Sequence, residues 1–236
     1  AFLGKQPEGR YVSSAKKLSN ADVGEVIKFG VDPTGPVGGS LLANLIQNPS
    51  LMERVNQGRE VGYIIIFVGL IGIAIAFWKL FTLYTMGVAV AKQAKSKTHD
   101  KSNPLGRVLA VGEEHMNKDI ETLELRLAEA IMAERPSIER GIPVVKIISV
   151  VAPLAGLLGT VTGMIVTFQQ ITLFGTGDPK IMAGGISQAL VTTVLGLVVA
   201  IPTTLLHSFA NSSARGIINV LEEQSTGIVA EHSDSK

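Results

Sequence analysis

The chain has 236 residues, of which 46% are hydrophobic and only 17% are charged, and its formal net charge is +1. This composition is typical of a membrane protein, and a charge so close to zero gives no reason to expect nucleic acid as a partner. The sequence contains no cysteine, which excludes disulfides and thiol chemistry. Its four histidines are scattered without metal-ligand spacing, so we expect no metal, no cofactor and no enzyme activity.

The first 60 residues are expected to form a segment outside the membrane. Gly, Pro and Ser are frequent over residues 1–40, and the chain starts at Ala1 without a signal-peptide pattern, so either a signal peptide was removed or a longer protein precedes it. From Leu41 to Val55 apolar residues recur at helical spacing, interrupted at Pro49. This pattern predicts two short amphipathic helices, which either lie along the membrane surface or pack on their own neighbours.

Three apolar stretches are long enough to cross a bilayer, which takes about 20 residues per helix. The first is uncharged from Val61 to Trp78 and is followed by Lys79, whose ammonium we expect to reach the membrane edge. The other two contain no charged residue from Ile147 to Gly177 and from Ile181 to Ala214. The sequence therefore predicts an all-α membrane protein with spans at 61–82, 142–174 and 181–210. The second and third spans are joined by a turn at 175–180 and extend beyond the bilayer.

The distribution of basic residues predicts how the chain is oriented. Residues 83–141 carry nine Lys or Arg, whereas the turn between the second and third spans carries only Lys180. By the positive-inside rule the 83–141 segment is cytoplasmic, and the N-terminus and the turn are periplasmic. Apolar residues at 3.6-residue spacing predict an amphipathic helix within 103–134, and Pro136 and Pro143 are expected to bend the entry to the second span. Residues 211–236 are expected to form a cytoplasmic helix that frays into a tail.

Small and hydroxyl residues recur along both long spans. Gly156 and Gly163 in the second span, and Gly185 and Gly196 in the third, have the spacing that lets helices pack closely in lipid. The polar residues suggest a lining for an ion path, and they are Thr160, Thr162, Gln188, Thr192 and Thr193. A threonine can equally bond to its own helix, so packing and lining both remain open for Thr160 and Thr193. None of these groups holds a proton near neutral pH, so a proton path would need a carboxylate from another subunit.

Two motifs resemble the MotA/TolQ/ExbB proton channel family. They are "APLAGLLGTVTGM" in the second span and "GGISQALVTTVLGLVVAIP" in the third. The resemblance implies a bacterial inner-membrane homopentamer around a pore. The pore would hold an ExbD- or TolR-like one-span partner, whose aspartate binds the proton, and a TonB-like protein would be driven. The family's two pore threonines match Thr160 and Thr193.

The chain departs from the family pattern in one respect that matters. ExbB and TolQ typically carry Glu where this sequence has Gln188. Together with the long N-terminal segment, this makes the chain most similar to ExbB or its larger variant TtpC, with a TolQ-like subunit as an alternative. The change also leaves a second function open, in which a pentameric scaffold docks TonB-system partners and conducts little by itself.

Overall fold

The computed structural model describes residues 9–28, 51–96, 100–175 and 179–234, and all regular elements in these ranges are α-helices. The chain divides into two compact units, Ala1–Arg54 and Val55–Lys236. In the first unit, α1 (Gly9–Ser19) carries two lysines in its last turn. The apolar stretch expected to form a helix over 41–46 lies outside the described residues. A short helix, α3 (Leu51–Gln57), follows it.

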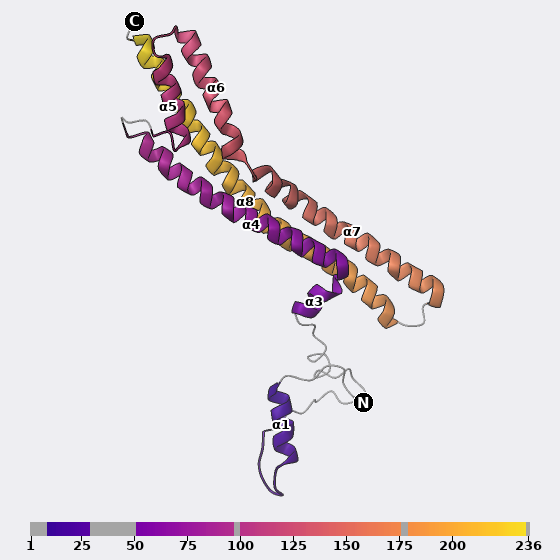
Figure 1. Cartoon of the computed structure of the whole chain (residues 1–236). Coiled ribbons are helices and arrows are strands. Elements are labelled where there is room, and N and C mark those ends of the chain that lie inside the picture. Colours follow the sequence, from indigo (N-terminus) through magenta and orange to yellow (C-terminus); the bar gives the residue numbers. More distant parts are fainter. Residues whose placement is uncertain (1–8, 29–50, 97–99, 176–178, 235–236) are drawn as a thin grey trace. The chain divides into compact units, whose positions relative to one another are not determined.

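Three long helices dominate the second unit, and each is long and apolar enough to cross a membrane. They are α4 (Arg59–Gln93), α7 (Ile142–Phe174) and α8 (Pro179–Asp234), with 35, 33 and 56 residues. In Figure 1, α7 and α8 form an antiparallel hairpin, and α4 lies against both. The three membrane-capable helices expected from the sequence are thereby confirmed.

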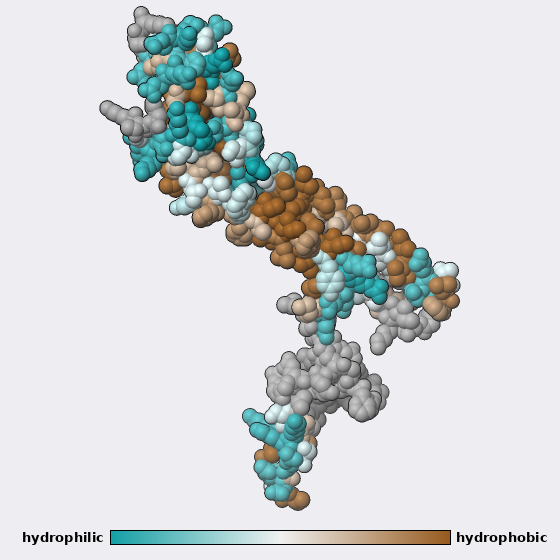
Figure 2. All heavy atoms as spheres, in the orientation of Figure 1, coloured by the Kyte–Doolittle hydropathy of each residue, from teal (hydrophilic) through white to brown (hydrophobic). Residues whose placement is uncertain are grey.

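The surface of these helices is apolar over their middle part. Figure 2 shows a hydrophobic band there, and bulky side chains such as Phe67, Leu154 and Leu190 are about 60% exposed within it. Many of the residues buried between the helices are small, among them Gly69 and Ala76. Large side chains facing outward and small ones inward suit helices surrounded by lipid, where close backbone packing holds helices together.

Two shorter helices, α5 (Pro104–His115) and α6 (Ile120–Glu139), pack against the distal parts of α4 and α8, and we call this part the α5–α6 end. The amphipathic helix expected within 103–134 corresponds to α6, whereas α5 before it was not predicted as a separate helix. Asn103 caps α5, because its side chain accepts a 2.8 Å hydrogen bond from the Gly106 N–H. Asp119 caps the N-terminus of α6, because its side chain accepts a 2.9 Å hydrogen bond from the Thr122 N–H.

α8 continues without a break from the apolar band to the α5–α6 end. It includes Pro202 and runs to Asp234, so no separate helix begins at residue 211. The expected fraying near the C-terminus is also absent up to Asp234, because His232 is buried and its Nε2 lies 3.1 Å from the Lys118 carbonyl oxygen. A single rod therefore joins the apolar band to the α5–α6 end.

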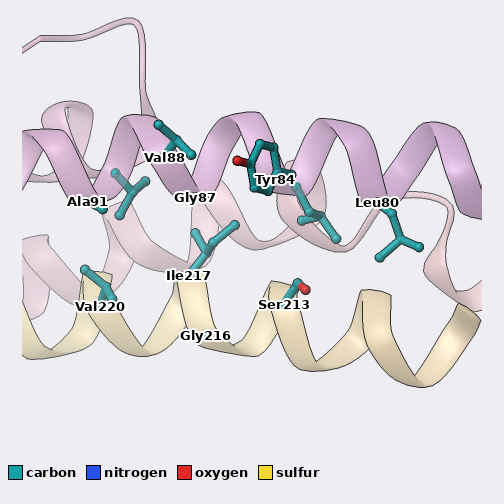
Figure 3. Close-up of a pocket in the computed structure, with 11 residues that line it drawn as sticks. Leu80, Tyr84, Gly87, Val88, Ala91, Ser213, Gly216, Ile217 and Val220 are labelled. Carbon is teal, nitrogen blue, oxygen red and sulfur yellow. The ribbon is translucent and has the colours of Figure 1, made fainter.

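A groove with a volume of about 630 Å³ lies between α4 and α8 (Figure 3). Its walls are apolar, and include Tyr84 and Val88 on α4 and Ile217 on α8. Two glycines widen it, because a Cβ added at Gly87 or at Gly216 would meet no atom within 4 Å. The groove begins beyond Phe209, the last large exposed apolar residue of α8, and so lies past the apolar band on that helix.

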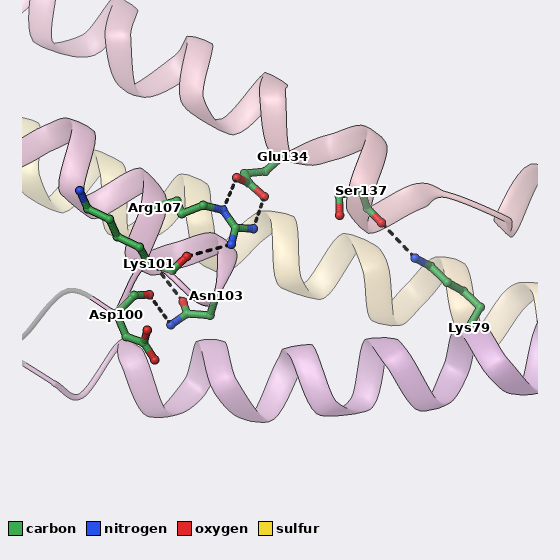
Figure 4. A network of polar contacts seen from close by, with 8 residues as sticks. Lys79, Asp100, Lys101, Asn103, Arg107, Glu134 and Ser137 are labelled. Atoms are coloured by element: carbon green, nitrogen blue, oxygen red, sulfur yellow. Dashed lines mark hydrogen bonds and ion pairs between the residues drawn. The ribbon is translucent and has the colours of Figure 1, made fainter.

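The junction between α6 and α7 is held by a buried lysine. Lys79 is 3% exposed and donates a 3.1 Å hydrogen bond to the Ser137 carbonyl oxygen (Figure 4). The expectation that its ammonium reaches the membrane edge is therefore not met, because the ammonium is enclosed within the protein. The chain turns at Gly141, whose φ of 88° favours glycine, and Pro143 starts α7 as expected. Pro136, expected to mark a bend, lies inside α6.

Candidate functional site

The two helices of the α7–α8 hairpin approach each other closely at glycines. A Cβ at Gly156 would lie 2.9 Å from the Thr192 carbonyl oxygen, and one at Gly196 would lie 2.7 Å from the Ala152 carbonyl oxygen. A Cβ at Gly163 would lie 3.1 Å from the Ala189 backbone nitrogen. Because backbone atoms cannot move aside as side chains can, Gly156 and Gly196 require glycine at the observed spacing, and Gly163 leaves little room for a larger residue.

Two threonines are enclosed within this contact. Thr192 is fully buried, faces Gly159, and donates a 2.8 Å hydrogen bond to the Ala189 carbonyl oxygen one turn earlier. Thr167 is 3% exposed, donates to the carbonyl oxygen of its own helix four residues back, and faces Gly185. In the protomer both hydroxyls are therefore satisfied locally, and Thr192 faces α7 instead of an open surface.

Thr160 and Thr193 lie on one flank of the hairpin. Each follows by four residues a residue of the contact, Gly156 on α7 and Ala189 on α8, which turns it by about 40° from the contact line at about 100° per residue. Since the two helices are antiparallel, this turn leads to the same flank on both. The Thr193 hydroxyl reaches across the contact, 3.4 Å from the Gly156 carbonyl oxygen, and Thr160 donates a 2.6 Å hydrogen bond to the Leu157 carbonyl oxygen.

The opposite flank carries Thr162, Gln188 and the helix α4. Thr162 is two residues from Thr160 and so points about 160° away, and Gln188 is five residues from Thr193 and points about 140° away. α4 packs on this side, where Gly69 faces Val199 and Gly72 faces Ile148. The structure thus places Thr160 and Thr193 on the same flank, and places Thr162, Gln188 and Thr192 elsewhere on the hairpin.

The flank that holds Thr160 and Thr193 has a simple chemistry, and we call it the threonine flank. Both residues are partly exposed, and α4 meets the hairpin on the other flank, at Val199 and Ile148. Between residues 147 and 175 of α7, and between residues 182 and 206 of α8, the sequence contains no ionisable side chain. The described residues also contain no group of His, Cys, Asp or Glu that could hold a metal ion. The surface can therefore hydrate an ion or bond to an acid, but it cannot bind a proton by itself near neutral pH.

Gly159 is a member of the glycine contact that was not predicted from the sequence. It faces Thr192, just as Gly185, which was predicted to pack, faces Thr167. Gly159 precedes Gly163 by four residues, the small-xxx-small spacing that marks close helix pairs in lipid, so the signal was present. The close approach at Ala189, by contrast, depends on the register between the two helices, which the sequence does not state.

Comparison with known proteins adds family relationships to this geometry. A family model described as the MotA/TolQ/ExbB proton channel family matches residues 100–223, more than half of the chain. The chain is 26% identical over 189 residues to a putative biopolymer transport protein ExbB homolog of Methanothermobacter thermautotrophicus, covering 73% of this chain and 67% of that protein. It is 29% identical over 175 residues to a putative biopolymer transport protein ExbB-like 1 of Synechocystis, covering 66% and 69%. A Synechocystis protein named ExbB-like 3 is 45% identical over 89 residues, 37% of this chain and 41% of the relative.

Proposed function

Because the chain belongs to the MotA/TolQ/ExbB proton channel family, we propose that it is an ExbB- or TolQ-like motor subunit of the bacterial inner membrane. In this proposal a homopentamer surrounds a one-span partner of the ExbD or TolR kind. Proton flow through the assembly drives a TonB-like protein that energises transport across the outer membrane. The curated relatives named as biopolymer transport proteins support this role.

The observation that carries the proposal is the threonine flank. Thr160 and Thr193 present hydroxyls on a face that α4 leaves uncovered, in a part of the hairpin without ionisable groups. A proton relay inside a membrane normally uses Asp, Glu or His. The carboxylate must then come from the partner, and the hydroxyls would hydrate it or bond to it.

The proposed orientation follows from the basic residues. The segment between the first and second spans contains nine Lys or Arg, so it and the α5–α6 end are placed in the cytoplasm. The N-terminal segment and the α7–α8 turn are then periplasmic. A cysteine introduced at Ser233 should react with an impermeant maleimide only after the cells are opened. Labelling of this cysteine in intact spheroplasts would contradict the proposed orientation.

The change Thr193→Val tests the role of the threonine flank. Valine keeps the shape and removes only the hydroxyl, and hydrogen bonds in membranes average only about 0.6 kcal/mol, so the variant should assemble. We expect normal pentamer yield by native mass spectrometry together with loss of growth that depends on TonB-type uptake. Wild-type growth of Thr193→Val would remove the ion-path role.

The matched control is Thr203→Val on the same helix. Thr203 is fully buried and donates to the carbonyl oxygens of Val199 and Ala200, away from the open flank. This variant should keep both pentamer yield and growth. Growth lost together with the pentamer in Thr193→Val would leave that residue only a packing role.

A scaffold that conducts little is the second candidate, and the sequence departure at Gln188 favours it. An amide stands where the family typically carries a carboxylate, so neither flank of the α7–α8 hairpin offers an acid within the uncharged stretches of the two helices. Both functions predict slow proton flux from vesicles that contain this chain alone. Fast flux on adding the one-span partner supports the motor, whereas flux that stays at the background of empty vesicles supports the scaffold.

A further inference from the structure

The helix α6 has two apolar faces, and only one of them is covered. Leu123, Leu127 and Ile131 are buried in the core of the α5–α6 end. On the other side a stripe runs along the exposed surface, and Leu125 and Met132 are 68% and 70% exposed within it. The stripe consists of Leu125, Ala128, Met132 and Pro136, all exposed and spaced three, four and four residues apart.

The spacing places this stripe away from the rest of the protomer. At about 100° per residue, its four members fall within about 80° of each other and point roughly 140° from the buried face. The stripe belongs to the α5–α6 end, where Figure 2 shows a hydrophilic surface, so lipid does not explain it. A continuous apolar stripe exposed to water marks a surface that meets another protein.

The helix α8 shows the matching arrangement. Its side toward α6 carries Ser225 and Val229, which face Leu127 and Ile131. The groove residues of α8, among them Ser213 and Gly216, point about 180° from that side. One side of α8 is thus covered by the protomer's own α6, and the opposite side borders an open apolar groove (Figure 3).

The stripe and the groove also lie at the same level along the molecule. The hydrogen bond from Lys79 to Ser137 ties α4 to α6 at one height (Figure 4). From this height the groove extends along α4 from Leu80 to Ala91, and the stripe extends along the antiparallel α6 from Pro136 back to Leu125. Both cover eleven residue steps, or about 16 Å of helix.

We propose that the α6 stripe of one copy of this chain binds in the α4–α8 groove of the next copy. Since the two surfaces differ and lie on opposite sides of the α6–α8 pair, the contact is head-to-tail, and repeating it around an axis parallel to the helices closes a ring. In that ring α8 and α6 alternate, each α8 lying between its own α6 and that of a neighbour. The inference rests on the homo-oligomer of the proposed function and assigns one of its contacts to the stripe and the groove.

Cysteine cross-linking tests the contact directly, because the chain contains no cysteine of its own. Two chains are coexpressed with different tags, one carrying Met132→Cys and the other Ser213→Cys, and membranes are treated with a mild oxidant. We expect a dimer that contains both tags, and no dimer when either variant is expressed alone. The double variant should form a ladder of covalent species up to the full ring. The control pair, Arg126→Cys with Ser213→Cys, should stay monomeric, because Arg126 lies about 100° from Leu125 around α6.

A second variant tests the groove by filling it. Gly216→Leu fills open space in the protomer and should therefore fold, yet it should reduce the ladder of the double-cysteine chain at least about fivefold. Gly184→Leu is the matched control on the same helix, since a Cβ there also meets no atom within 4 Å, and it should leave the ladder unchanged.

The outcomes separate this contact from the oligomer itself. A pentamer in native mass spectrometry without the mixed dimer overturns the contact and leaves the proposed homopentamer, whether or not phospholipid is found in the groove. Dimers from either single variant alone would mean a symmetric contact and would also overturn it. A ladder that closes at another number keeps the contact and overturns the pentamer, and a protein that is only monomeric overturns both.

Discussion

The ammonium of Lys79 on α4 donates a hydrogen bond of 3.1 Å to the carbonyl oxygen of Ser137 near the end of α6. The last carbonyls of a helix have no partner within the helix, and the chain turns away at Gly141 before one could form. The lysine thus provides the donor that the end of α6 lacks. It also fastens α4 to the point where α6 becomes α7.

Lys79→Met should loosen this junction, because methionine keeps most of the volume of the side chain and removes the donor. The hydrogen bond is partly buried although Ser137 itself is exposed, so losing the donor costs up to about 1–3 kcal/mol. We expect trypsin to cleave after Arg140 roughly tenfold faster in the variant, measured in detergent by the loss of intact protein. Lys92→Met, an exposed residue of the same helix, should be cleaved at the wild-type rate; equal rates for both variants would contradict the role of Lys79.

Gly196→Ala should disrupt the α7–α8 hairpin although it adds a single methyl group. The new Cβ would lie 2.7 Å from the Ala152 carbonyl oxygen and 3.2 Å from the Gly156 Cα, and both are backbone atoms. The helices must separate, so the yield of monodisperse protein after extraction should fall several-fold. Gly184→Ala places its methyl group in open space on the same helix and should match the wild type. A Gly196→Ala protein with wild-type yield would show that the helices can shift at no cost.

Arg107 and Glu134 should be the strongest ion pair to test at the α5–α6 end. The guanidinium donates two hydrogen bonds of 2.7 Å to the carboxylate, which raises the pKa of Arg107, and a third of 3.0 Å to the Lys101 carbonyl oxygen. Lysine cannot reproduce this fork, so Arg107→Lys should lower the midpoint of thermal unfolding by a few degrees. Arg126→Lys alters an exposed pair with Glu129 and should change the midpoint by less than the experimental error.

Asp100 should make the α5–α6 end sensitive to acid. The backbone N–H and then the hydroxyl of Ser102 donate to its carboxylate and hold the pKa of Asp100 below its ordinary value. A carboxyl with a lowered pKa in the folded state stabilises the fold above its unfolded pKa of about 3.9 and loses that contribution as the pH falls through the folded value. The thermal midpoint of the wild type should therefore exceed that of Asp100→Ala by a constant amount from about pH 5 to 7. This difference should shrink at lower pH, and one that grew with acid would reverse the sign of the argument.

The three long helices could be predicted from the sequence because long apolar stretches without charge are typical of helices that cross a membrane. The division between α5 and α6 was missed, although its signals are local: Asn103 before Pro104, and Asp119 three residues before Thr122. Both are helix caps of known form. The apolar period that predicted a helix in this segment belongs to α6 alone, and the caps that separate it from α5 were not used.

The site was less accessible to sequence reasoning than the fold. Thr192 and Thr193 are neighbours in the chain, yet one is enclosed against Gly159 and the other reaches the open flank. The distinction depends on which face of α8 meets α7, and both faces carry small and hydroxyl residues. Lys79 shows the same difficulty, because its side chain is buried only through the position of α6, which the sequence does not reveal.

The two connections between the apolar band and the α5–α6 end differ in stiffness. The α6–α7 connection has a joint at Gly141, whereas α8 is a single rod in which Thr193 and Ser213 are separated by twenty residues, or about 30 Å. A rod of this kind transmits rotation about its own axis from one end to the other, and a joint absorbs it. Although Pro202 lies between the two residues, the helix is continuous, so we expect a rotation of α8 near Thr193 to reach the groove wall more directly than it reaches α6. The α5–α6 end is thus joined to the apolar band by one connection with a turn at Gly141 and by one continuous helix.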